Sequence, residues 1–83
     1  MQLKLEHTTT NFTQYWDNID DISTNSFFYE FLIDTSRLQD GEYLLSLYDD
    51  DNIKLCDTLV KIGEYQSTKI TYNKKKKYIT YGK

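Results

Sequence analysis

The sequence predicts an all-β fold, a small antiparallel β-sandwich of about six or seven short strands. Two observations predict this fold. Aromatic residues make up 16% of the chain, and Tyr, Phe and Ile, which favour strands, make up most of its apolar residues. Short alternating segments recur between polar breaks, a spacing typical of sandwiches with immunoglobulin-like architecture. The 83 residues include no Pro, so no rigid linker divides the chain, and we expect one domain.

The first expected strand covers residues 2–6, where polar and apolar side chains alternate. The following polar, Thr-rich stretch ends it. Within residues 12–22, Tyr15, Ile19 and Ile22 recur at helical spacing. We therefore expect a loop there with at most one helical turn.

Residues 27–34 form the clearest expected strand. Phe27, Tyr29, Phe31 and Ile33 lie at alternate positions, so they share one face of the strand. This face is wholly apolar, and we expect it to point into the core.

The connection after this strand contains a turn dipeptide, Asp40-Gly41, in which Gly tolerates a positive φ. Leu38, Gly41 and Tyr43 together fit a tyrosine corner, in which a Tyr hydroxyl donates to upstream backbone. In that case the hydroxyl of Tyr43 bonds near Leu38 or Gln39. The alternative is an ordinary connection into the next strand.

A β-hairpin is expected from residues 43–48 and 53–62, joined by the acidic turn at residues 49–52. Apolar residues change from odd to even positions along the second strand. This change of parity predicts a β-bulge near Asp57.

The C-terminal part should add strands at residues 68–72 and 78–81 around a turn at 73–77. We divide the chain into a sandwich body, residues 1–65, and a Lys- and Tyr-rich strand or arm, residues 66–83. This second segment is expected to pack on the same domain or on a neighbouring subunit.

Charge is distributed unevenly between these two parts. All 13 acidic residues lie at or before Glu64, which gives the part before Lys69 a charge of −9, whereas the part from Lys69 onward carries +6. The basic run is either a solvated face or a segment that docks on an acidic surface. In the second case Tyr side chains add apolar area with a polar tip. The predicted interface consists of Lys69, Tyr72, Lys74, Lys75, Lys76, Lys77, Tyr78 and Tyr81.

The sequence offers little for catalysis or metal binding. Cys56 and His7 are single, which excludes an intrachain disulfide and argues against a four-ligand zinc site or a His-based triad. We expect Cys56 to be a buried structural thiol. No phosphate-binding Gly loop and no catalytic group of residues is visible, so we expect neither an enzyme nor a cofactor.

Two charged segments have alternative interpretations. The acidic turn at 49–52 has oxygen ligands for Ca²⁺, but its acids are consecutive and no distant Glu follows, which favours a plain hairpin turn. The lysines at 74–77 with neighbouring Tyr residues suit nucleic acid, but the acidic body argues against it, and none is expected. No apolar run is long enough for a membrane span, and residues 1–6 show no secretion signal.

About half of the chain resembles a known group of proteins. The elements are Leu38, Gly41, Glu42 and Tyr43, then Leu47, Tyr48 and Asp49, then Ile62, Gly63, Glu64 and Tyr65. They resemble the small β-rich virion proteins, of the head-fibre or decoration type, of crAss-like and related tailed phages of gut Bacteroidales. Residues 12–22 match no part of that pattern.

This resemblance implies a non-catalytic structural component of a tailed-phage virion, made in the host cytoplasm and assembled into a head fibre, a head decoration or a tail. Its expected partners are other copies of itself and other virion proteins. The alternative is a phage-encoded binding module that inhibits a host protein through its acidic face.

Overall fold

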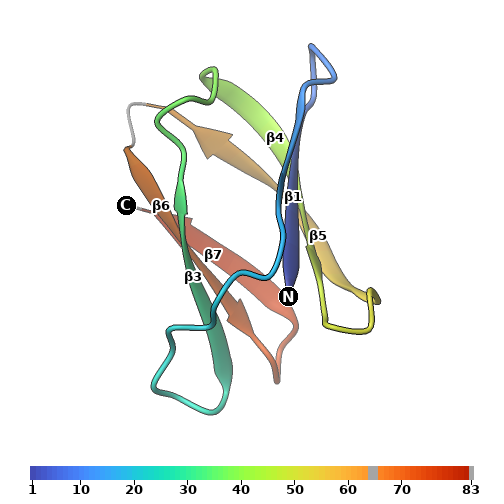
Figure 1. Ribbon diagram of the computed structural model, residues 1–83, viewed down its shortest axis with the longest axis vertical. Coiled ribbons are helices and arrows are strands. Elements are labelled where there is room, and N and C mark those ends of the chain that lie inside the picture. The colour runs from blue at the N-terminus through green and yellow to red at the C-terminus, as the bar shows by residue number, and fades with distance from the viewer. Residues whose placement is uncertain (64–65, 83) are drawn as a thin grey trace.

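A computed structural model describes residues 1–63 and 66–82 of the chain. Seven strands and no helix occur in this part, arranged as two antiparallel sheets (Figure 1). The strands are β1 (Gln2–His7), β2 (Thr13–Trp16), β3 (Phe28–Asp34), β4 (Gly41–Tyr48), β5 (Lys54–Ile62), β6 (Ser67–Asn73) and β7 (Tyr78–Gly82). The predicted all-β sandwich is confirmed.

The two sheets have the strand orders β2-β1-β4-β5 and β3-β6-β7. An immunoglobulin constant-type domain likewise has four and three strands, and its C-F-G sheet has the same order as β3-β6-β7. The four-stranded sheet differs, because β1 and β4 are central here, whereas the second and fifth strands are central in that domain. The protein is thus a two-sheet β-sandwich that shares the strand order of one sheet with that domain and differs from it in the other.

The core lies between the sheets and follows from period-2 alternation. Leu3 and Leu5 of β1 point inward, and the strand register places Leu47 and Leu45 of β4 opposite them. The buried apolar side chains are Leu3, Leu5, Phe31, Ile33, Tyr43, Leu45, Leu47, Val60, Ile62, Ile70 and Tyr72. Every strand except the short β2 and the edge strand β7 contributes to this set.

The expectation of a loop over residues 12–22 was wrong at residues 13–16, because β2 lies there and pairs with β1, whereas residues 17–22 form no strand or helix. Asn11 adopts φ 61°, and the His7 N–H donates to the Phe12 carbonyl (2.7 Å), so the chain turns back as a hairpin. The helical spacing of the apolar residues in this stretch is therefore coincidental. Strand pairing, which depends on a distant segment, overrides the local period.

The face of β3 agrees with its prediction except at its start. Phe31 and Ile33 are buried, but Phe27 precedes the strand and is 60% exposed. The Phe27 N–H donates to the Asn25 side-chain oxygen (2.9 Å), which holds Phe27 in the connection before the strand. Its placement in the core was therefore wrong.

The β4–β5 hairpin is present, but its irregularity is not at Asp57. Leu47 lies opposite Cys56 and Tyr48 opposite Lys54, so Leu55 is the extra residue. The bulge therefore comes at the beginning of β5, close to the turn that joins the two strands.

Residues 66–82 belong to the same domain as the strands before them. β6 is the central strand of its sheet and pairs along its whole length with β3. Ile70 and Tyr72 of β6 are part of the core. This segment is therefore not an appended arm, and the body boundary drawn at residue 65 lies outside the described residues.

Candidate interaction surface

Three connections gather at one end of the sandwich, the lower end in Figure 1. They are the β2–β3 connection (17–27), the β4–β5 turn (49–53) and the β6–β7 turn (74–77). We call this the loop end. We call the other end, with residues 8–12 and 35–40, the corner end. The two ends use their polar and apolar side chains differently.

The lysine turn (residues 74–77) is held in shape by the side chain of Asn73. Its Oδ1 accepts the backbone N–H groups of Lys75 (3.0 Å) and Lys76 (2.9 Å). The Lys77 N–H donates to the Asn73 carbonyl (2.7 Å), with Lys77 at φ 57°. The turn is thus held by its backbone and by the Asn73 side chain, and the exposed lysine side chains at positions 75–77 are available to a partner.

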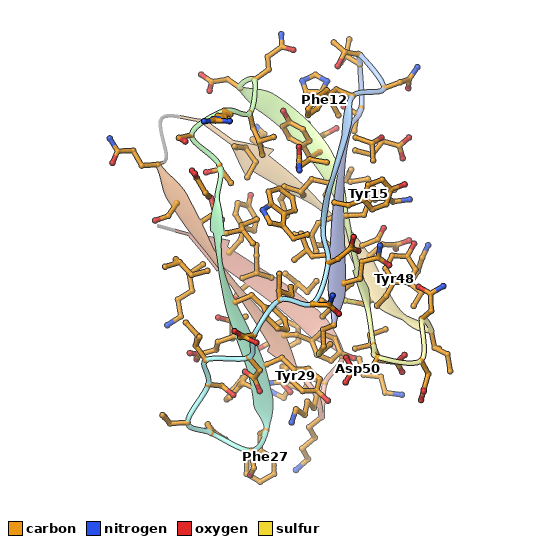
Figure 2. All side chains as sticks on the ribbon, in the orientation of Figure 1. Phe12, Tyr15, Phe27, Tyr29, Tyr48 and Asp50 are labelled. Atoms are coloured by element: carbon orange, nitrogen blue, oxygen red, sulfur yellow. The ribbon has the colours of Figure 1, made fainter. Side chains whose placement is uncertain are left out.

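Aromatic side chains adjoin the lysine turn. The Lys74 N–H donates to the Phe27 carbonyl (2.9 Å), which links the β2–β3 connection to this turn. Phe27 and Phe28 line a groove of about 230 Å³ together with Asn73, Lys75 and Lys76. In Figure 2, Phe27 lies at the lower tip of the molecule. Sequence analysis missed this groove, although the polar break before Phe27 is a signal for a loop.

Lys74 differs from its neighbours because it packs against the protein. Its Nζ lies 4.0 Å from the ring centroid of Tyr29, a cation–π geometry. The Tyr29 ring in turn stacks on Tyr72, with centroids 6.1 Å apart. Tyr72 is only 3% exposed, and burial, followed by nearby Cys56 and Tyr29, raises its pKa. The assignment of Tyr72 to an interface was therefore wrong.

Two further residues of the predicted interface have internal partners. Lys69 pairs with Glu30 across the β3–β6 ladder (Nζ–Oε2 3.5 Å). The Tyr81 hydroxyl accepts the backbone N–H of Lys61 (3.2 Å), so it joins β7 to the outer edge of β5. Of the predicted set, the exposed residues at the loop end are Lys75, Lys76, Lys77 and Tyr78.

Acidic side chains occupy the adjoining part of the loop end. The Met1 amino group is 2.6 Å from Asp50, and the Gln2 side-chain amide donates to Asp17 (2.8 Å). Asp49 Oδ1 accepts the N–H groups of Asp51 and Ile53, both at 2.9 Å. Asp49 therefore serves the hairpin turn, as the simpler interpretation expects. Within residues 1–63 and 66–82, no group of three or more His, Cys, Asp or Glu is arranged to hold a metal ion.

Asp21 connects the acidic and basic parts of the loop end. Burial by itself raises the pKa of this carboxyl, but the backbone N–H groups of Glu30 and Ser23 and the charge of Lys74 lower it overall. Its Oδ1 accepts the Glu30 N–H (2.9 Å), which covers part of the free edge of β3. The acidic connection and the lysine turn are therefore direct neighbours.

At the corner end, the predicted tyrosine-corner hydrogen bond is present. The Tyr43 hydroxyl donates to the Gln39 carbonyl (2.5 Å), and Leu38 packs half-buried against the core. Burial, then the charge of Asp40, raises the pKa of Tyr43. Gly41 adopts φ 144°, which an L side chain rarely allows.

His7 completes the corner end in a structural role. It is 6% exposed, and its ring meets Tyr43 edge-on at 4.8 Å. Its Nδ1 accepts the N–H groups of Thr9 and Thr10, both at 3.2 Å, so it shapes the β1–β2 turn. The single histidine is therefore built into the fold.

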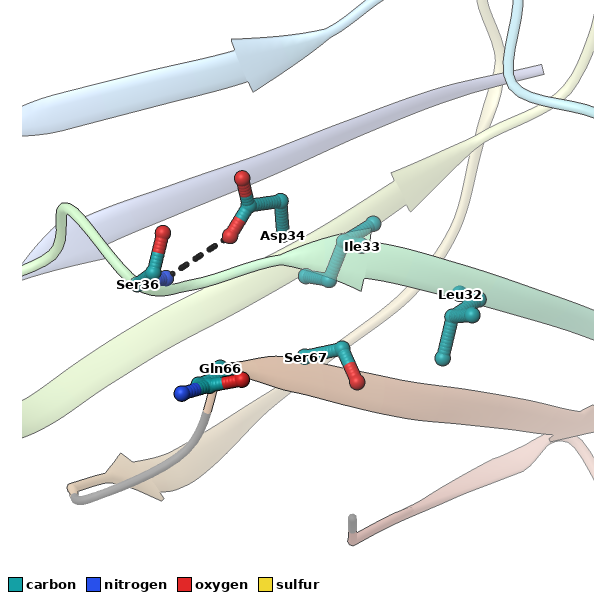
Figure 3. Close-up of a pocket in the computed structure, with 6 residues that line it drawn as sticks. All are labelled: Leu32, Ile33, Asp34, Ser36, Gln66 and Ser67. Carbon is teal, nitrogen blue, oxygen red and sulfur yellow. Dashed lines mark hydrogen bonds between the residues drawn. The ribbon is translucent and has the colours of Figure 1, made fainter.

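A second, open groove lies where β3 ends and β6 begins (Figure 3). Its carboxylate, Asp34, accepts the N–H of Ser36 (2.9 Å), and hydrogen bonds from Ser36 lower its pKa. An aspartate with a lowered pKa stays ionised at neutral pH, so it is a poor proton donor. Among the described lining residues, no His or Lys accompanies it.

Cys56 is half-buried rather than buried, and it lies next to Leu55, the extra residue of the β5 bulge. Burial, followed by the charge of Asp57, raises the pKa of its thiol. Since the thiolate is the reactive form, this environment makes Cys56 a weak nucleophile at neutral pH.

Comparison with known proteins finds no matching family model, no matching curated protein and no matching solved structure. Among the described residues, no helix has the length and apolar character needed to cross a membrane.

Proposed function

We propose that this protein is a non-catalytic structural component of a tailed-phage virion that acts through protein–protein assembly. The observation that carries the assembly role is the loop end, where the exposed Phe27 and the exposed lysines at 75–77 lie side by side. Aromatic anchors surrounded by polar groups are a common composition for protein interfaces. The virion setting is supported by the resemblance of residues 27–65 to small phage head proteins.

The surface suits a protein partner better than a small substrate. The groove between Phe27, Phe28 and the lysine turn holds about 230 Å³, which is less than most small-molecule sites. It accommodates one apolar side chain, with Lys75 and Lys76 placed to meet acidic groups beside it. Other copies of the chain and other virion proteins are the proposed partners.

A second candidate function is inhibition of a host protein through the acidic part of the loop end. Its support is the position of Asp17 and Asp20 beside Asp50, which lie far apart in the sequence but border neighbouring hollows around Met1. A basic partner would be attracted to this surface.

Quantitative mass spectrometry of purified virions tests the main proposal. The expected result is a fixed, repeated number of copies per particle in density-purified phage from a host culture. A chain that is abundant in infected cells but absent from purified particles would contradict the virion role. Co-purification with one host protein from those cells would instead support the inhibitor.

A further inference from the structure

We infer that the loop end binds the loop end of a second copy of this chain, with the lysine turn of each copy against the acidic turn of the other. This inference rests on the proposed assembly function and names its first partner. The two copies would be related by a two-fold axis, so each contact occurs twice.

Charge complementarity within one face supports this partner. The lysine turn carries Lys75–Lys77 in exposed positions, and the neighbouring acidic turn carries the exposed Asp50 and Asp51. The Lys74 N–H donates to the Phe27 carbonyl, and Asp21 and Asp50 line one hollow, so the lysine turn, the β2–β3 connection and the acidic turn share one surface. A surface with both signs side by side complements its own copy after a two-fold rotation.

Apolar complementarity supports the same pairing. Ile53 follows the acidic turn and is 60% exposed, whereas Phe27 and Phe28 line a mostly apolar groove beside the lysine turn. In the proposed dimer, Ile53 of each copy enters that groove of the other copy. The ion pairs and the apolar contact then lie next to each other, because Ile53 follows the acidic turn and the apolar groove adjoins the lysine turn.

The same arrangement argues against nucleic acid as the occupant. A phosphate backbone bound along Lys75–Lys77 would also approach Asp21, which lies in the connection that is hydrogen-bonded to the lysine turn through Phe27 and Lys74. Like charges repel such an extended ligand, whereas the short acidic turn of a second copy would lie against the lysine turn alone in the proposed dimer.

The size of the surface predicts a weak dimer. The molecule measures 34 × 24 × 22 Å, and the loop end lies at one end of its longest axis (Figure 1). A face of about 24 × 22 Å is at the low end of specific interfaces, so we expect a dissociation constant in the micromolar range or above. Many such contacts in one particle would add up through multivalency.

A charge-swap experiment with the full chain tests the inference. One variant carries Lys75→Glu and Lys76→Glu, and the other carries Asp50→Lys and Asp51→Lys. Sedimentation equilibrium is measured for wild type, for each variant alone and for their equimolar mixture. We expect each variant alone to dimerise at least about tenfold more weakly than wild type, because both symmetric contacts become repulsive.

The mixture should recover dimerisation, since both contacts of the mixed dimer again join opposite charges. Wild-type dimerisation should weaken between about 0.01 M and 1 M salt, as the screening length falls from about 30 Å to about 3 Å. The control is Arg37→Glu with Lys61→Glu, which changes the net charge by the same amount away from the loop end and should leave dimerisation unchanged.

Two substitutions at equally exposed apolar residues test the apolar contact. Phe27 and Leu32 are 60% and 59% exposed, but only Phe27 is at the loop end. Phe27→Ser should weaken the dimer, and Leu32→Ser should not. If a charge-reversed variant unfolds, Lys75→Gln with Lys76→Gln replaces it and should weaken dimerisation by a smaller factor.

A wild-type chain that stays monomeric at low salt would overturn the inference. A mixture of the two variants that fails to recover dimerisation would overturn it too. So would a monomer that binds single-stranded DNA through its lysine turn. These outcomes differ from failure of the virion proposal. A chain that is present in virions but monomeric in solution would rule out only the dimer proposal. A dimer absent from virions would end only the virion role.

Discussion

The two ends of this sandwich are both rich in polar residues but use them in opposite ways. At the corner end, His7, Tyr43 and Gly41 pack on one another, and their hydrogen bonds are to backbone of the same end. At the loop end, backbone groups are satisfied by Asn73 and Asp49, which leaves lysines, aspartates and Phe27 exposed. The difference indicates that the corner end maintains the fold, whereas the loop end is available for contact.

The largest expected contrast involves two phenylalanines four residues apart. Phe31 is fully buried and Phe27 is 60% exposed. Phe31→Ala should lower the free energy of unfolding by about 3–5 kcal/mol, because it removes apolar contacts and leaves a cavity. Phe27→Ala should change it by less than about 0.5 kcal/mol. Urea denaturation measures both, and equal effects would show that the loop end is part of the core.

The next contrast compares two glycines. A Cβ at Gly41 would lie 2.5 Å from His7 Nε2, at a φ of 144°, whereas a Cβ at Gly82 meets nothing within 4 Å. Gly41→Ala should therefore cost about 3 kcal/mol, from backbone strain and displacement of the His7 ring. Gly82→Ala should cost less than about 0.5 kcal/mol. Thermal melts measure both variants, and an unchanged melting temperature for Gly41→Ala would contradict the tight packing of the corner end.

A smaller contrast compares two tyrosine hydroxyls. Tyr43→Phe keeps the buried ring but loses the hydrogen bond to the Gln39 carbonyl, so it should cost about 1 kcal/mol. Tyr78 is 47% exposed at the loop end, and Tyr78→Phe should leave stability unchanged within about 0.3 kcal/mol. Chemical denaturation measures the stability of both variants. Equal denaturation midpoints would contradict a stabilising tyrosine-corner hydrogen bond.

The smallest expected effect concerns pH at the loop end. The folded state lowers the pKa of Asp21 below its ordinary value of 3.8, because the hydrogen bonds from Glu30 and Ser23 and the charge of Lys74 outweigh burial. Its stabilising contribution is therefore fully present above pH 3.8 and is lost as the pH falls through the lower folded pKa.

An NMR titration of the Ser23 amide, whose N–H also donates to Asp21 Oδ1 (2.9 Å), follows this loss directly. Asp21→Asn provides the control, since an amide does not ionise and the signal should then be independent of pH in this range. A Ser23 amide whose shift moves only above pH 3.8 would contradict the direction of the pKa change.

Much of the fold could be predicted because it depends on local patterns. Alternation in residues 27–34 identified β3, Asp40-Gly41 identified the corner, and consecutive acids at 49–52 identified a hairpin turn. The candidate surface was predicted only in part. Lys75, Lys76 and Tyr78 are exposed as expected, but Tyr72 is in the core.

The sequence by itself determined that this chain forms short strands joined by polar turns, because side-chain period and turn chemistry act within a few residues. Tertiary structure alone decided which faces and turns meet. It placed β6 between β3 and β7, which buried Tyr72, and it brought Phe27 to the lysine turn and the acidic turns to the same end. The physical reason is that burial depends on which strand lies opposite, and that partner can be forty residues away.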